Sequence, residues 1–158
     1  MGDSIPITTK GKRIIEQRLA DLEAKGPGLR KALELAREKG DLSENAEFHA
    51  AREAIGQLEG QINELNDKLR RAQIVDPRRA PRDRVAFGAI VTVVDLETEK
   101  EEIWQLVGLG EDDPDDNRIL TTSPLGQGLM LKKKGEEAEL KLPRGNVRYR
   151  VQDIRYPS

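Results

Sequence analysis

Two acidic side chains, Asp41 and Glu44, lie three residues apart just after Gly40. Carboxylate oxygens are the hard ligands that Mg²⁺ takes, and one or two suffice when a partner supplies the rest of the shell. Phosphodiester chemistry commonly uses two metal ions about 4 Å apart. Two exposed acids form no pocket, so any such chemistry would take place inside another macromolecule that already holds a metal. The same spacing also fits a capping box at the start of a helix, and local sequence leaves both interpretations open.

A basic pair, Arg37 and Arg52, lies on either side of these acids in the sequence. Guanidinium groups form charge-assisted hydrogen bonds with phosphates, so the pair is suited to hold an RNA backbone. The alternative is a solvated helix face, in which Glu34, Glu38 and Glu53 pair with the basic residues along each helix.

The elements that position these residues are indicated by two apolar series with steps of three and four residues. The first series is Ile15, Leu19, Leu22, Gly26, Leu29, Leu33 and Ala36, and the second is Phe48, Ala51, Ile55, Leu58, Ile62, Leu65 and Leu69. Such steps place a stripe along one face of a helix, as in a coiled coil. Taken in opposite order, the members pair so that every sum of residue numbers is 84. The pattern predicts an antiparallel helical hairpin with its tip at residues 40–44, and a kink or short break at Gly26-Pro27-Gly28.

The second half has a different period. Apolar residues alternate in four segments, residues 89–94, 102–107, 138–142 and 147–151, which predicts strands. Ser123 followed by Pro124 predicts a helix start, with the helix running to about Leu131. The two prolines at positions 77 and 81 indicate a linker. We therefore expect a two-domain α+β chain: a hairpin over residues 1–76, a linker over 77–82 and a small α+β domain over 83–158.

Composition excludes several kinds of site. The 158 residues contain no cysteine and one histidine, His49, which excludes thiolate nucleophiles, cysteine-held zinc and multi-histidine metal centres. The net charge of −2 argues against a bulk DNA-binding protein, so any nucleic-acid contact must come from a local patch. No apolar run approaches the roughly 20 residues of a membrane helix. We expect a soluble cytoplasmic protein without membrane contact, and a monomer, because the hairpin buries its own seam.

Residues 40–52, with the sequence GDLSENAEFHAAR, resemble the tip signature of the bacterial Gre transcript-cleavage factors, closest to the GreA type. The second half carries a further, less specific match. Its residues are Ser123-Pro124-Leu125-Gly126, Gly135, Pro143-Arg144-Gly145 and Tyr149-Arg150-Val151. The resemblance spans essentially the whole chain. Two positions depart from the family pattern, because Phe48 replaces a frequent tyrosine and Glu136 replaces the usual aspartate.

The resemblance implies a function and roles for particular residues. The C-terminal domain would be similar to FKBP-type immunophilins and would dock on RNA polymerase beside its secondary channel, which the coiled coil would enter. Asp41 and Glu44 match the tip acids that help to hold the second Mg²⁺ and a water, so that the polymerase hydrolyses backtracked RNA. This Mg²⁺ would be held jointly with the polymerase, and weakly or not at all by the isolated chain. Arg37 and Arg52 match the basic patch that contacts the nascent RNA 3′ end.

The docking surface is less clearly carried over, and the loop of Ser123, Pro124, Leu125 and Gly126 is our candidate. The leading hypothesis is an elongation factor that stimulates transcript cleavage and has no activity alone. One alternative is a Gre-like inhibitor that binds the channel without stimulating cleavage. An alternative of another class is a peptidyl-prolyl isomerase or chaperone, which would need a proline pocket lined by aromatic residues.

Overall fold

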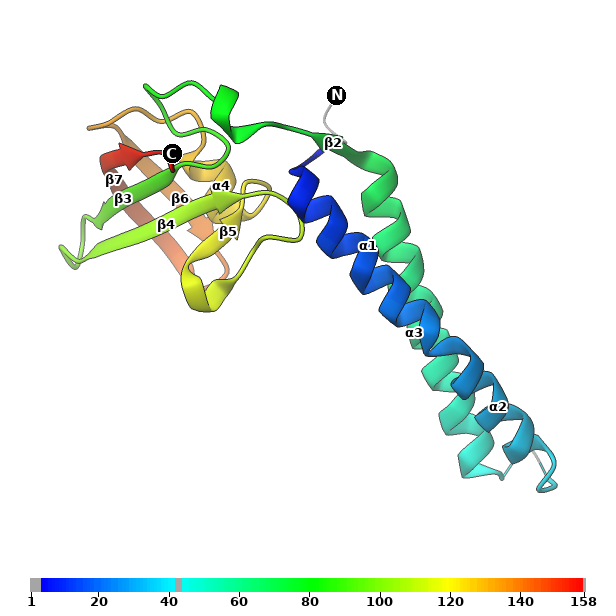
Figure 1. Ribbon diagram of the computed structural model, residues 1–158. Coiled ribbons are helices and arrows are strands. Elements are labelled where there is room, and N and C mark those ends of the chain that lie inside the picture. The colour runs from blue at the N-terminus through cyan, green and yellow to red at the C-terminus, as the bar shows by residue number, and fades with distance from the viewer. Residues whose placement is uncertain (1–3, 42–43, 158) are drawn as a thin grey trace. The chain divides into compact units, whose positions relative to one another are not determined.

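The computed structural model describes residues 4–41 and 44–157 (Figure 1). Its elements, in chain order, are β1 (Ile5–Ile7), α1 (Thr9–Ala24), α2 (Gly26–Arg37), α3 (Ala46–Arg71), β2 (Ala72–Ile74), the 3₁₀ helix η1 (Pro77–Arg79), β3 (Ile90–Asp95), β4 (Glu101–Val107), the 3₁₀ helix η2 (Pro114–Asp116), β5 (Arg118–Leu120), α4 (Pro124–Leu129), β6 (Glu137–Leu142) and β7 (Gly145–Arg155). The chain forms two compact units, one of residues 13–71 and one of residues 1–12 with 72–158.

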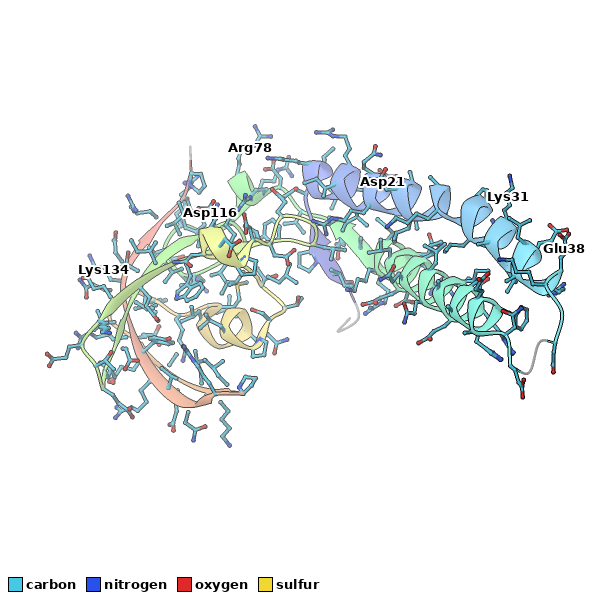
Figure 2. All side chains as sticks on the ribbon, turned by 90° about the horizontal axis from the view of Figure 1, so that it is seen from below. Asp21, Lys31, Glu38, Arg78, Asp116 and Lys134 are labelled. Atoms are coloured by element: carbon cyan, nitrogen blue, oxygen red, sulfur yellow. The ribbon has the colours of Figure 1, made fainter. Side chains whose placement is uncertain are left out.

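The helical unit is the predicted antiparallel hairpin, in which α1 and α2 run along α3 (Figure 1). All fourteen members of the two apolar series are buried or partly buried, which confirms the seam. Charged side chains outside the series, such as Asp21, Lys31 and Glu38, are exposed (Figure 2). Along the described parts of the chain, no helix has the length and apolar character needed to cross a membrane.

The first arm of the hairpin is interrupted at Lys25, between α1 and α2. Lys25 keeps a right-handed helical backbone, with φ −78° and ψ −16°, so the chain continues in nearly the same direction. Pro27 lies in the first turn of α2, where its missing N–H would have no helical partner in any case. Gly26 is buried in the seam. The predicted disturbance is therefore a short break, after which a new helix starts in phase with the first.

The two ends of the hairpin are joined by a short parallel ribbon, which no local sequence pattern indicates. Strands β1 and β2 pair in register from Ile5↔Ala72 to Ile7↔Ile74. The ribbon belongs to the unit that contains the C-terminal half, and the Leu109 N–H donates to the Pro6 carbonyl at 3.1 Å within that unit. Residues 4–12 consequently group with the C-terminal half.

The compact units thus divide the chain differently from our predicted boundaries at residues 76 and 82. Within the predicted linker, Pro77–Arg79 form η1, and the Asp76 carboxylate caps it by accepting from the Arg78 N–H at 3.0 Å. The Arg78 guanidinium also donates to this carboxylate, and the hydrogen bonds from its side chain and then from its backbone N–H hold the pKa of Asp76 below its ordinary value.

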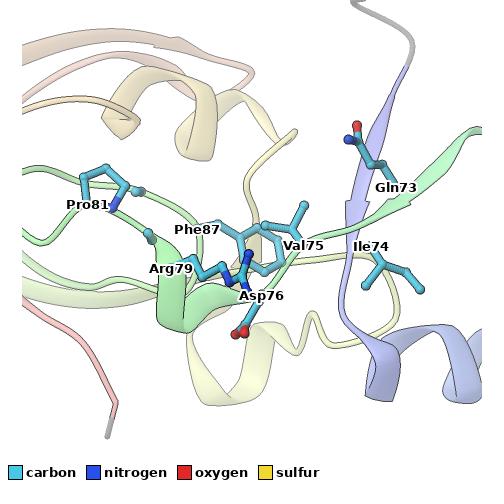
Figure 3. Close-up of a pocket in the computed structure, with 9 residues that line it drawn as sticks. Gln73, Ile74, Val75, Asp76, Arg79, Pro81 and Phe87 are labelled. Atoms are coloured by element: carbon cyan, nitrogen blue, oxygen red, sulfur yellow. The ribbon is translucent and has the colours of Figure 1, made fainter.

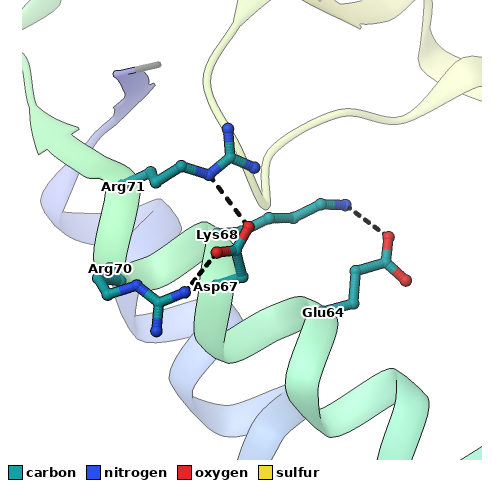
Figure 4. Close-up of polar contacts among 5 residues, drawn as sticks. All are labelled: Glu64, Asp67, Lys68, Arg70 and Arg71. Carbon is teal, nitrogen blue, oxygen red and sulfur yellow. Dashed lines mark hydrogen bonds and ion pairs between the residues drawn. The ribbon is translucent and has the colours of Figure 1, made fainter.

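Helix α3 ends in a cluster of basic side chains (Figure 4). The Asp67 carboxylate accepts hydrogen bonds from Arg70 and Arg71, and Lys68 pairs with Glu64 at 3.2 Å. The hydrogen bond from Arg70 is the main reason why the pKa of Asp67 lies below its ordinary value. Cations at this end interact favourably with the negative pole of the helix dipole and so stabilise the C-terminal end of α3.

The C-terminal unit is built on a five-stranded sheet in the order β5-β4-β3-β7-β6. Neighbouring strands are antiparallel, except for the parallel pair β4–β5. Helix α4 packs against β6, and side chains from the sheet and α4 form the core. The fully buried members are Val85, Ala89, Val91, Val93, Leu106, Leu129, Tyr149 and Val151. The four predicted strands are confirmed, and the two-unit α+β class with them.

Candidate functional site at the hairpin tip

The tip is a tight connection between α2 and α3. Helix α2 ends at Arg37 with Glu38 as its C-cap residue, and Gly40 has φ +118°, a backbone conformation that favours glycine. Asp41 and Glu44 follow, both exposed, while positions 42 and 43 of the predicted tip lie outside the described residues. The local backbone therefore presents the two acids at the end of the hairpin.

Asn45 closes the tip through its side chain. Its Oδ1 accepts from the Phe48 N–H at 3.0 Å, and its Nδ2 donates to the Ala36 carbonyl at 2.7 Å. The first bond caps α3, and the second ties the end of one arm to the start of the other. The capping box considered for Asp41 and Glu44 is thus wrong, because Asn45 immediately precedes the helix and supplies its cap.

Asp41 and Glu44 line a shallow hollow of about 380 Å³. Its other residues are Lys39, Asn45, Ala46 and Glu47. Lys39 and Glu47 form an exposed ion pair at 2.8 Å, which links the end of α2 to the first turn of α3.

The hollow offers hard carboxylate oxygens of the type that Mg²⁺ prefers. Within the described ranges, however, no group of three or more acidic or histidine side chains could surround a metal ion. The donor set fits part of an Mg²⁺ shell, and the remaining ligands would have to come from a partner.

Of the two basic residues predicted to contact RNA, Arg37 lies beside Phe48. The Arg37 guanidinium carbon lies 5.9 Å from the centroid of the Phe48 ring, within reach of a cation–π contact. Arg52 lies one helical turn after Phe48 on α3, and both arginines are exposed. Since Phe48 is buried and follows the Asn45 cap, its ring is a fixed support for Arg37.

When the chain is compared with known proteins, each of its two halves matches its own family model. Residues 5–74 match the N-terminal model of the transcription elongation factors, and residues 80–156 match the C-terminal GreA/GreB model. Transcription elongation factor GreA of Thermodesulfovibrio yellowstonii is 42% identical over 157 residues, which cover 99% of both chains. GreA of Maricaulis maris is 40% identical over 153 residues, 96% of this chain and 98% of its own. This chain belongs to the GreA/GreB family of transcription elongation factors.

Among solved structures, the chain is similar to the GreA factor homolog 1 (Gfh1) protein of Thermus thermophilus. The two are 24% identical with a TM-score of 0.45, over 96% of this chain and 99% of that chain.

The family's C-terminal domain contains the loop that we predicted to dock on a partner. Ser123 caps α4 by accepting from the Gly126 N–H at 3.1 Å, which confirms the predicted helix start. The helix ends at Leu129, two residues before the predicted end. Gly126 is buried, and a Cβ there would lie 2.2 Å from the Leu120 carbonyl oxygen. Gly126 is thus required for packing, and Pro124 is the exposed residue of the loop.

A larger hollow of about 630 Å³ lies in the C-terminal unit (Figure 3). It is lined by Gln73, Ile74, Val75, Asp76, Arg79, Ala80, Pro81, Ala86 and Phe87. Its one acid, Asp76, is occupied as the cap of η1, and its one aromatic residue is Phe87. This lining brings no pair of catalytic groups together and does not form the aromatic pocket that a prolyl isomerase needs.

Proposed function

We propose that this chain binds RNA polymerase and stimulates the polymerase's own cleavage of backtracked RNA, which rescues arrested complexes. It acts as an accessory factor, and the hydrolysis belongs to the polymerase. The observation that carries the proposal is an exposed pair of carboxylates, Asp41 and Glu44, at the end of a hairpin that buries its own seam. A GreA/GreB family member with such a tip is suited to deliver acids into a narrow channel.

Asp41 and Glu44 would hold Mg²⁺ jointly with ligands of the polymerase. When bound there, this ion would supply a water of lowered pKa for attack on a phosphodiester. The chain's own part is to bring two hard oxygen donors to the polymerase in a fixed arrangement. Asn45 supports that arrangement, because its two hydrogen bonds join the ends of both arms directly beside the acids.

Arg37 and Arg52 would hold the backbone of the RNA 3′ end. Their guanidinium groups are exposed and carry the donors that phosphates accept. The Phe48 ring beneath Arg37 restricts that side chain, so less conformational freedom is lost when RNA binds.

The C-terminal unit would provide the docking contact, with Ser123 and Pro124 at its surface. A hairpin that buries its own seam needs no second copy, so we propose that the factor acts as a monomer, in the cytoplasm with the polymerase. The tip acids could then act only where the partner's active site accepts them.

The test is a transcript-cleavage assay on a stalled, backtracked elongation complex with labelled RNA and Mg²⁺. We expect shortened RNA with the wild-type chain, no cleavage of free RNA, and no stimulation by the combined variant Asp41→Asn and Glu44→Gln. Glu47→Gln is the matched control, because Glu47 lines the same hollow but is engaged by Lys39. Full stimulation by the double variant would refute the role of the acids. Polymerase binding without any cleavage by the wild type would instead identify a channel-binding inhibitor.

A further inference from the structure

Leu131 is held in a backbone conformation that leucine rarely adopts. Its φ is +69°, in the left-handed region, and it is the second residue after the end of α4. This position commonly carries glycine, which has no Cβ to clash there. A bulky residue in this region is unusual, and such outliers tend to occur at functional sites.

Backbone hydrogen bonds account for the conformation but not for the side chain. The Leu131 N–H donates to the Val85 carbonyl at 2.7 Å, and the Val85 N–H donates to the Lys132 carbonyl at 2.8 Å. Glycine or asparagine at position 131 would make the same backbone bonds with less strain.

Packing does not account for the leucine either. The residue is 65% exposed, more than the other exposed large apolar residues in the described part of the chain, Leu35, Ile74 and Ile103. The leucine therefore adds unfavourable backbone geometry and buries little apolar surface in return.

Cationic residues follow this exposed leucine in the chain and also lie on an adjoining segment. Three lysines follow it, Lys132, Lys133 and Lys134, and Lys134 is exposed at the surface (Figure 2). Because residue 85 is bridged to residues 131 and 132, the segment containing Arg82 and Arg84 lies alongside.

This neighbouring segment is fixed in place by the C-terminal residues. The Arg82 guanidinium lies 5.2 Å from the Tyr156 ring centroid, and the Tyr156 hydroxyl donates to the Arg84 carbonyl. We call Leu131 with Arg82, Arg84 and Lys132–Lys134 the Leu131 surface.

One of these cations is paired with a local acid, because the Arg84 guanidinium donates to both oxygens of the Asp83 carboxylate at 3.1 Å. Asp83 is also close enough to Lys133 to interact with its charge, and Glu136 accepts from the Lys133 backbone N–H at 2.9 Å. Within the described ranges, no ion pair within 4 Å engages the three lysines. The surface thus combines an exposed apolar anchor with a positive rim.

We propose that the Leu131 surface docks on an acidic protein surface with an apolar recess, and that this recess belongs to the RNA polymerase. The identity of the partner rests on the proposed function. A nucleic-acid backbone would match the positive charge, but it offers no recess for an aliphatic side chain. An acidic protein surface matches both the rim and the anchor. The helix that has Ser123 as its N-cap and Pro124 in its first turn is followed by Leu131 two residues beyond its end.

The experiment measures the affinity of the full chain for core polymerase free of nucleic acid, by fluorescence anisotropy. Leu131→Gly should weaken binding about tenfold to a hundredfold, the factor that corresponds to burial of a leucine side chain. Thermal unfolding should stay unchanged or rise, because glycine relieves the backbone. Leu131→Asn should weaken binding by a similar factor, because asparagine also tolerates this backbone conformation. Lys133→Ala with Lys134→Ala should weaken binding most at low salt.

The matched control is Ile103→Ala, which removes another exposed aliphatic side chain from the same unit and should leave the affinity unchanged. Wild-type affinity in both Leu131 variants, with normal binding by the wild type, would overturn this inference alone. Weakened binding that is seen only when DNA or RNA is present would also overturn it and assign the surface to nucleic acid. Failure of the wild type to bind polymerase would overturn both this inference and the proposed function.

Discussion

Replacing Asn45 by alanine should loosen the hairpin tip without unfolding the chain. The substitution removes an N-terminal cap, which contributes about 0.5–2 kcal/mol, and a side-chain hydrogen bond between the arms, which contributes about 0.5–1.5 kcal/mol. The cap bond to Phe48 and the bond to Ala36 measure 3.0 and 2.7 Å, so both are well formed. The tip should therefore lose about 1–3 kcal/mol of local stability, which is about a fivefold to hundredfold increase in opening.

Hydrogen exchange of the Phe48 amide measures this opening directly, because that amide donates to Asn45. Its protection should fall by the stated factor, while amides near Gln61 in the middle of α3 keep theirs. Asn45→Asp is the informative control, since a carboxylate still caps the helix but cannot donate to the Ala36 carbonyl. Its effect should be smaller than that of alanine, and cleavage stimulation should follow the same order. Unchanged Phe48 protection in Asn45→Ala, or equal effects of the two variants, would refute the reasoning.

Three further predictions concern packing, pH and metal. Gly126→Ala should lower the free energy of unfolding by about 1–3 kcal/mol, because the new Cβ would lie 2.2 Å from the Leu120 oxygen. Gly60→Ala, in open space on α3, should raise it by about 0.5–1 kcal/mol, and denaturant titration of both variants checks the contrast. Burial raises the pKa of Tyr149 to about 12, above its unfolded value of about 10. The contribution of the neutral Tyr149 side chain to stability is therefore complete below pH 10 and is lost as the pH rises to 12. The urea midpoint of the wild type should fall between pH 9 and pH 11.5, and the fall should be smaller in Tyr149→Phe. Calorimetry should find only weak Mg²⁺ binding by the isolated chain, and tight binding would contradict a shared metal shell.

The helical hairpin could be predicted because its determinants are local and repeated. Fourteen seam positions obey one arithmetic rule, and each of them is buried or partly buried. A stripe of this length specifies helix, orientation and pairing together, since any other alignment would expose apolar side chains. Even the glycine at position 26 keeps the rule, because it is buried in its expected place.

The cap and the ribbon were missed for different physical reasons. Asn45 directly precedes the first helical residue and has Phe48 three positions on, which is a recognisable capping signal. The acid pair at Asp41 and Glu44 offered a competing cap with the same chemistry. Strands β1 and β2 have three residues each and lie 67 positions apart, so no periodicity indicates their pairing. Such contacts depend on the tertiary structure and carry almost no local signal.

The requirement for Gly126 was also invisible in the sequence. The glycine is needed because the Leu120 carbonyl approaches it from β5, a three-residue strand that was not predicted. Leu131 shows the converse, because a leucine is unremarkable in a sequence until its backbone angle is known. Roles of the tip residues in binding metal and RNA stay predictions until the cleavage assay is done.

The parallel pairing of β1 with β2 makes the whole hairpin a crossover connection between two neighbouring strands. The strand register fixes where the connection leaves and returns, whatever its length. Adding seven residues to each arm would preserve the three-four steps of the seam and extend the hairpin by about 10 Å. Neither the capped turn at one end nor the paired strands at the other would change. Duplication or deletion of whole repeats would therefore change the length of the hairpin, and with it the distance that the tip can reach into a partner. The tip turn and the paired strands would stay as they are.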